Sequence, residues 1–111
     1  MEMSVEHLAG GVAVVRPSGR MDLLSSALVK QTFATEIAGG HGKLIVDLSA
    51  VTFVDSSGLG ALVGGLKTAR AGGGDLRIAC VPELTRVVLE LTTLDRVLKP
   101  FPTVEEALAD L

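Results

Sequence analysis

The sequence predicts an α/β fold in which helices pack on a mixed β-sheet that opens with an N-terminal hairpin. Two closely spaced strand patterns joined by a glycine turn predict the hairpin. Strand and helix patterns then alternate to the end of the chain, which is typical of a sheet with a parallel portion. The chain has 111 residues, of which 48% are hydrophobic. It is therefore long enough to bury one core, and we expect a single domain over residues 1–111.

The hairpin comes first. A weak strand is expected over Ser4–Leu8, and Gly10-Gly11 supplies the turn signal. A stronger strand is expected over Val12–Arg16, closed by Pro17-Ser18-Gly19. Because the two strands are separated by so few residues, we expect them to pair antiparallel.

A helical pattern follows over Asp22–Ala38. Asp22 is a suitable N-cap, and Val29, Phe33 and Ile37 recur at every fourth position. The pair Gly39-Gly40 provides a stop signal. One face of this helix is therefore expected to pack on the sheet.

The next segment, Lys43–Leu48, is a nearly continuous apolar run, as expected for a strand buried on both faces at the centre of a sheet. A loop and a helix over Ser57–Ala71 follow it. The remaining expected elements are a strand over Leu76–Val81, a helix over Pro82–Leu91, a short strand over Arg96–Leu98 and a helix over Thr103–Leu111. Thr103 and Glu106 have the spacing of a capping box at the last helix start.

Composition excludes several function classes. The formal net charge is −3, no basic run occurs and aromatic residues make up 3%, so nucleic-acid binding is not expected. No stretch approaches the ~20 apolar residues of a membrane span, and the polar N-terminus does not resemble a secretory signal. Cys80 is the sole cysteine and is expected to be a buried, inert thiol. We therefore expect a cytoplasmic protein without direct nucleic-acid or membrane partners.

The most informative segment is Asp55-Ser56-Ser57-Gly58, at the expected start of the second helix. A helix N-terminus carries free N–H groups and a partial positive charge. One serine can cap the helix, and the other then presents its hydroxyl to solvent. Phosphorylation there would add about −1.5 to −2 charges, favoured by the helix end and repelled by Asp55. The simpler alternative is that the two serines are only a cap and its neighbour.

The helix that follows has two kinds of position. Leu59, Leu62, Val63 and Leu66 form one apolar face. Most of its other early positions are small: Gly58, Gly60, Ala61, Gly64 and Gly65. Because each glycine costs a helix interior up to ~1 kcal/mol relative to alanine, close approach of another backbone is expected. That neighbour is either the protein's own sheet or helix, or a partner protein.

Two segments partly resemble nucleotide-binding motifs, but neither has the required spacing. Gly58, Gly60 and Gly64 deviate by one residue from the dinucleotide-binding spacing and lie inside the helix. The pair Lys67-Thr68 does not directly follow a glycine, as a phosphate-binding loop requires. No nucleotide cofactor is therefore expected.

Catalytic and metal chemistry also lack support. A serine nucleophile needs a base, and only His7 and His41 are available, in an expected strand and an expected turn where solvation is the simpler role. Asp22, Asp47 and Asp55 are explained by caps and turns rather than by a metal. We expect no catalytic residue, no metal site and no cofactor.

Three segments together resemble one family. VVRPSGRMD at residues 14–22, LIVDL at residues 44–48 and FVDSSGLG at residues 53–60 are similar to STAS domains, and in particular to stand-alone bacterial anti-sigma factor antagonists. The resemblance covers nearly the whole chain. It implies a STAS-like fold and a regulator that is a substrate of other enzymes rather than an enzyme.

The resemblance also implies a partner-switching cycle. The unphosphorylated antagonist would bind an anti-sigma factor with serine kinase activity and free a sigma factor. Phosphorylation of Ser57 would block this binding, and a metal-dependent serine phosphatase would restore it. The expected site comprises Ser57 and its flanking residues Asp22, Asp55, Ser56, Gly58, Leu59 and Gly60. The alternatives are a STAS scaffold or a small-ligand-binding module without sigma-factor regulation.

Overall fold

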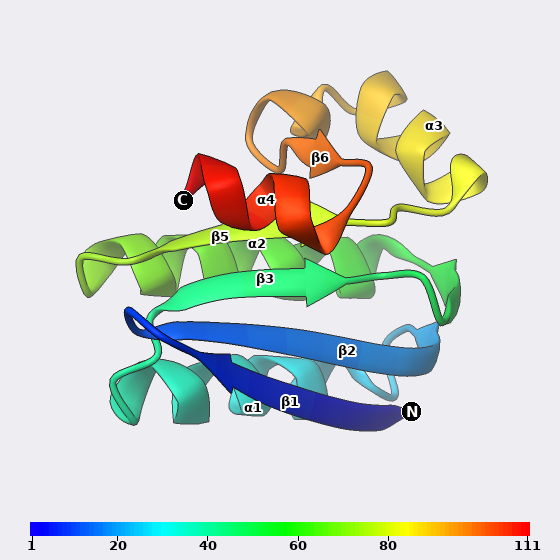
Figure 1. The fold of residues 1–111 in the computed structure, drawn as a ribbon. Helices are drawn as coiled ribbons and strands as arrows, with labels where there is room; N and C mark the ends of the chain where they lie inside the picture. The colour runs from blue at the N-terminus through cyan, green and yellow to red at the C-terminus, as the bar shows by residue number, and fades with distance from the viewer.

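The computed structural model describes all 111 residues (Figure 1). The strands are β1 (Glu2–Leu8), β2 (Val12–Met21), β3 (Lys43–Asp47), β4 (Val51–Val54), β5 (Asp75–Ala79) and β6 (Pro100–Phe101). The helices are α1 (Ser26–Ala38), α2 (Ser56–Ala71), α3 (Glu83–Leu91) and α4 (Val104–Asp110), with a 3₁₀ turn η1 (Leu94–Arg96). None of these helices combines the length and the apolar character that crossing a bilayer requires.

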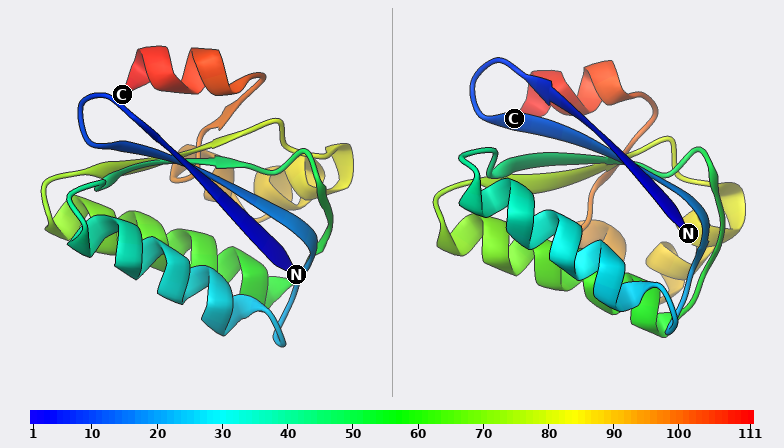
Figure 2. Two further views of the ribbon diagram at one scale, coloured as in Figure 1. Left: turned by 60° about the horizontal axis from the view of Figure 1, so that its bottom comes forward. Right: turned by 90° about the horizontal axis from the view of Figure 1, so that it is seen from below.

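The strands form one mixed sheet in the order β1-β2-β3-β5-β6, and β4 pairs with the far end of β2. Only the hairpin β1-β2 is antiparallel; the other pairs are parallel. Helices α1 and α2 cover one face of the sheet, and α4 lies across the other (Figure 2). The predicted α/β fold with its N-terminal hairpin is thus confirmed.

The central strand β3 is buried on both faces, as predicted. Leu44, Ile45 and Val46 have no exposed surface. Leu44 and Val46 belong to the core beneath α1 and α2, whereas Ile45 belongs to a smaller cluster beneath α4. Because both faces are covered, every residue at the centre of the strand must be apolar, which accounts for the continuous run in the sequence.

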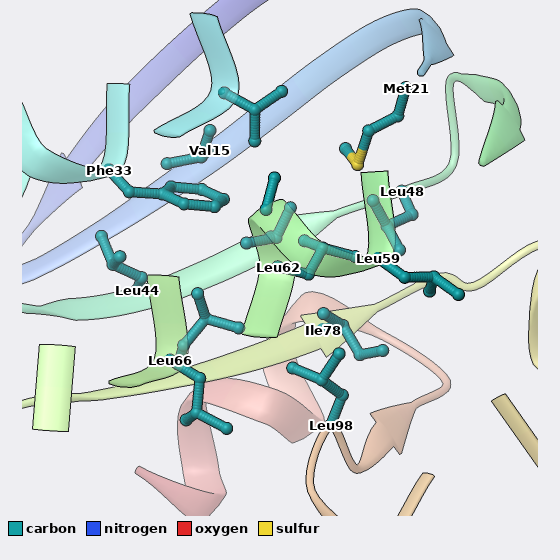
Figure 3. Packing of buried hydrophobic residues seen from close by; sticks show 14 of the residues in the cluster. Val15, Met21, Phe33, Leu44, Leu48, Leu59, Leu62, Leu66, Ile78 and Leu98 are labelled. Atoms are coloured by element: carbon teal, nitrogen blue, oxygen red, sulfur yellow. The ribbon is translucent and has the colours of Figure 1, made fainter. Parts of the chain in front are cut away.

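The larger core is built on the apolar face predicted for α2. Leu59, Leu62 and Leu66 point into the layer between the helices and the sheet, where Phe33 of α1 and Leu44 also lie (Figure 3). Each fully buried leucine contributes roughly 1.5–3 kcal/mol relative to leaving it exposed. The contacts fix the position of α2, and with it the position of its N-terminal end.

The glycines of α2 divide into two groups. A Cβ on Gly58 would lie 2.2 Å from the Met21 carbonyl oxygen, and one on Gly65 would lie 2.5 Å from the Phe33 ring. Gly60 and Gly64 instead face open space, with nothing within 4 Å of an added Cβ. The protein's own strand and helix therefore account for Gly58 and Gly65 but not for the other two.

Two features of the first half differ from the sequence prediction. Strand β2 does not end at Arg16 but continues to Met21, because β1 pairs with Pro17 and Ser18 and the register shifts only after Gly19, where φ is +105°. The expected loop before α2 contains a further strand, β4, whose Val54 pairs with Met21. The extension of β2 and the presence of β4 belong together, since each supplies the other's pairing partner.

The predicted strand over Arg96–Leu98 is wrong. Residues 94–96 form η1, and the edge strand β6 comes two residues after Leu98. Thr93 adopts a left-handed conformation with φ 58° that turns the chain after α3, and Leu98 is fully buried as a single anchor rather than as part of a strand. At the start of α4, the Thr103 hydroxyl accepts a hydrogen bond from the Glu106 N–H at 3.1 Å, as the capping spacing predicts.

A network of charged side chains ties the start of β5 to its neighbours. Asp75 accepts a hydrogen bond from Arg70 Nε at 3.1 Å and lies 2.8 Å from Arg77, which also binds Asp110 at 2.8 Å. Desolvation acts to raise the pKa of Asp75, but hydrogen bonds from Arg77, the Leu76 N–H and Arg70 outweigh it and lower that pKa below 3.8.

We expect Asp75→Asn to lower the free energy of unfolding at pH 7 by about 1 kcal/mol. A carboxylate whose pKa is lower in the folded state stabilises the fold above its unfolded pKa, and this contribution is lost as the pH falls through the folded pKa. The difference in the free energy of unfolding between wild type and Asp75→Asn should therefore shrink below about pH 4. Urea unfolding at pH 7 and at a pH below about 4 measures this difference. The control is Glu90→Gln, a substitution at an exposed residue. An equal difference at both pH values would show that charge is not the cause.

Candidate functional site

The candidate site lies where β2 and β4 end, at the right-hand side of Figure 1. Met21 and Val54 are paired in the parallel ladder, so the next residues, Asp22 and Asp55, leave the sheet at the same edge. The Asp55 N–H donates a hydrogen bond to the Met21 carbonyl at 3.2 Å. Two carboxylates far apart in sequence are thus brought to one edge by strand pairing.

Asp55, and not one of the serines as predicted, caps α2. Its carboxylate accepts a hydrogen bond from the Gly58 N–H at 3.0 Å. Aspartate and serine are about equally good N-caps, so the backbone decides: Asp55 is extended, with φ −100° and ψ −172°, whereas Ser56 and Ser57 are already helical. Both serine hydroxyls are therefore free of a capping role. Ser56 is exposed and Ser57 is half-buried.

The residues after Ser57 have distinct positions. Gly58 is buried against Met21. Leu59 enters the core. Gly60 is exposed and lies one turn beyond Ser57 on the same side of the helix. Of the flanking residues expected from the sequence, Gly58 and Leu59 thus hold the helix start in place, and Gly60 contributes to the outer surface.

Asp22 was predicted to cap α1, but that helix begins at Ser26. The Asp22 carboxylate instead accepts hydrogen bonds from the Leu24 and Ser25 N–H groups at 3.1 and 3.2 Å, which closes a turn before the helix. Desolvation acts to raise the pKa of Asp22, but hydrogen bonds from the Ser25 N–H, the Arg20 side chain and the Leu24 N–H outweigh it and lower that pKa. Asp22 therefore carries its negative charge at neutral pH.

Sequence reasoning missed the apolar side chains around this edge. Leu24 is 93% exposed, Leu23 is 72% exposed and Phe53 is 41% exposed. Arg20 lies over the Phe53 ring, 4.2 Å from its centroid, and also bonds Asp22 at 3.4 Å. Beside them is a shallow hollow of about 340 Å³, lined by Met1, Arg20, Asp22, Leu24, Ser25 and Leu28. An exposed apolar surface could have been predicted from the pair Leu23-Leu24, because these two residues lie in the turn between Asp22 and the helix.

The other chemically interesting residues lie elsewhere. His7 and His41 are at the opposite end of the sheet, near the β1-β2 turn, so neither can serve as a base for Ser57. His7 is exposed, in line with the expected solvated role, and its ring stacks on the ring of the half-buried His41. Cys80 is half-buried rather than buried, and its thiol pKa is raised by desolvation and by the nearby Asp47.

The comparisons with known proteins agree with this architecture. A sequence model of the STAS domain matches residues 5–107. The anti-sigma-F factor antagonist RsfB of Mycobacterium tuberculosis is 32% identical over 100 residues, covering 88% of this chain and 80% of RsfB. The crystal structure of an anti-sigma factor antagonist from Mycobacterium paratuberculosis superimposes with a TM-score of 0.85 and 30% identity, covering 98% of this chain and 92% of that one.

A third similar protein is TM1081, whose NMR structure superimposes with a TM-score of 0.84 at 28% identity, over 98% of this chain and 87% of that one. These matches extend over 88–98% of this chain and 80–92% of the similar proteins rather than over one motif. They also bear out the prediction that the protein is a regulator and not an enzyme. The chain therefore belongs to the STAS-domain family of anti-sigma factor antagonists.

Proposed function

We propose that this protein binds an anti-sigma factor with serine kinase activity and so releases a sigma factor, until phosphorylation of Ser57 breaks the complex. A serine phosphatase then restores binding. The observation that carries the proposal is the cap of α2. Because Asp55 occupies the capping position, the Ser57 hydroxyl is not needed to hold the helix and is free to be modified.

Charge supplies the physical basis of the switch. A phosphate on Ser57 adds about −1.5 to −2 charges at pH 7. It would join the carboxylates of Asp22 and Asp55, which leave the same edge of the sheet. The N–H groups of Ser56 and Ser57 have no partner within the helix and favour an anion there. The phosphate is therefore tolerated by the fold and acts mainly by making this edge repel an acidic or apolar partner surface.

The surface around Ser57 also fits a protein partner. The exposed Leu23, Leu24 and Phe53 form an apolar rim beside the charged groups. Along α2, Ser57, Gly60 and Gly64 follow one another at helical spacing, and the two glycines face open space. A helix face without side chains permits close approach of a partner backbone, which explains glycines that the protein's own packing does not require.

The test is phosphorylation by candidate anti-sigma kinases from the same genome, followed by intact mass measurement and native gels. We expect wild type to gain one phosphate, and Ser56→Ala, the matched control, to gain it as well. Ser57→Ala should gain none and should still bind the kinase. Binding should be lost in phosphorylated wild type and in Ser57→Asp.

Two results would contradict the proposal. In the first, no kinase modifies the protein, and in the second, Ser57→Asp binds as tightly as wild type. Either result would favour a STAS scaffold or a small-ligand-binding module, in which Ser57 is only a residue of the first helical turn.

A further inference from the structure

Three side chains with metal-ligating atoms converge at the end of the sheet opposite Ser57. They are His7 of β1, Glu36 in the last turn of α1 and His41 in the turn before β3. Their ligating atoms all lie within 4.8 Å of one another. His7 Nε2 contacts Glu36 Oε1, and the rings of His7 and His41 stack with centroids 3.8 Å apart.

The backbone itself places His41 beside Glu36. The His41 N–H donates to the Glu36 carbonyl at 2.9 Å, and the Gly40 N–H donates to the Ile37 carbonyl at 3.2 Å. With Gly40 at φ +89°, this is the Schellman arrangement that ends many helices. It brings the residue after the glycine back over the last turn, so the Glu36–His41 pair does not depend on side-chain attraction.

His7 is brought to this pair by the hairpin. His7 is paired with Ala13 in the antiparallel ladder, and the Lys43 N–H donates to the Gly11 carbonyl of the hairpin turn at 3.1 Å. The turn and the end of α1 are in close contact, since a Cβ on Gly11 would lie 3.1 Å from the Gly40 carbonyl oxygen. Three separate segments are thus held together by main-chain bonds and packing, which keeps the three side chains close to one another.

We infer that His7, Glu36 and His41 form a binding site for a divalent transition-metal ion, with Zn²⁺ the best match. Two imidazoles and one carboxylate are a zinc ligand set that leaves a coordination position open. Calcium and magnesium prefer oxygen ligands alone, so this set discriminates against them. The site lies at the far end of the sheet from Ser57 and does not rest on the proposed switch.

Binding requires a local rearrangement. Stacked rings, with planes only 7° from parallel, cannot both direct a nitrogen lone pair at the same ion. Ligating atoms around tetrahedral zinc are about 3.3 Å apart, which follows from metal–ligand bonds of about 2.0–2.1 Å. One ring must therefore rotate and the set must contract. The His7 side chain is 53% exposed, which gives it room to do so.

The experiment is a calorimetric titration of the full chain, first stripped of metal with a chelator, with ZnCl₂ at neutral pH. We expect one ion per chain, an affinity in the low micromolar range and a rise in the unfolding temperature on binding. His7→Ala, Glu36→Gln and His41→Asn should each weaken binding at least tenfold.

Two matched controls complete the design. Cys80→Ser removes the sole thiol, a zinc-binding group outside the proposed site, and should leave binding unchanged. Ser57→Asp should also bind zinc normally, which separates this site from the proposed switch. The inference is overturned if no zinc binds at millimolar concentration, if Cys80→Ser abolishes binding, or if His7→Ala binds as tightly as wild type. Circular dichroism of each variant confirms that the fold is retained.

Discussion

We expect Leu24→Asp to weaken binding of the anti-sigma factor by about 100-fold, or about 2.8 kcal/mol. Leu24 is 93% exposed and lies between Asp22 and α1, with its N–H bonded to the Asp22 carboxylate. A partner that covers this leucine removes its apolar surface from water, which contributes roughly 1.5–3 kcal/mol when the side chain becomes fully buried. An aspartate there would remove this contact and bury a charge beside the carboxylate of Asp22.

The same substitution should leave the free energy of unfolding almost unchanged, because an exposed side chain contributes little to the core. Isothermal titration with the anti-sigma partner and urea unfolding measure the two effects separately. Leu91→Asp is the matched control, since Leu91 is 80% exposed at the far end of α3 and receives the same charge. Equal losses in both variants would indicate a general charge effect, and no loss in Leu24→Asp would place the docking surface elsewhere.

The parts of the fold that could be predicted from the sequence are those fixed by local pattern. The continuous apolar run of β3, the four-residue spacing of Val29 and Phe33 and the apolar face of α2 each require a particular burial, and each has it. Strand β4 was missed because it is four residues long and two of them are exposed, so no burial pattern marks it. Its pairing with β2 is a tertiary contact between distant segments.

In the candidate site too, local patterns were predicted from the sequence and tertiary contacts were not. The sequence identified the segment around Ser57, but the prediction that a serine caps the helix was wrong, because Asp and Ser have similar N-cap preferences and the sequence does not distinguish them. The extended backbone of Asp55, set by β4, makes that choice. Likewise, the exposure of Leu24 and the meeting of His7 with His41 depend on how the hairpin and α1 are joined, which no local pattern records.

We expect Gly58→Ala to cost about 3 kcal/mol of stability, although alanine is the better helix former by up to ~1 kcal/mol. The new Cβ would lie 2.2 Å from the Met21 carbonyl oxygen and 2.9 Å from Met21 Cγ. The side chain of Met21 can move, but its carbonyl oxygen cannot, because it accepts the hydrogen bond of the Asp55 N–H. Either that bond breaks or the start of α2 moves away from β2.

Gly60→Ala is the matched control, two residues further along the same helix. An added Cβ there meets nothing within 4 Å, so this variant should gain up to about 1 kcal/mol from the better helix former. Urea unfolding of both variants measures the contrast. If Gly58→Ala proves as stable as Gly60→Ala, then the contact between Met21 and the helix start is not rigid. Ser57 would then sit on a helix end that can move relative to Asp22, and the switch would not depend on a fixed geometry at this edge.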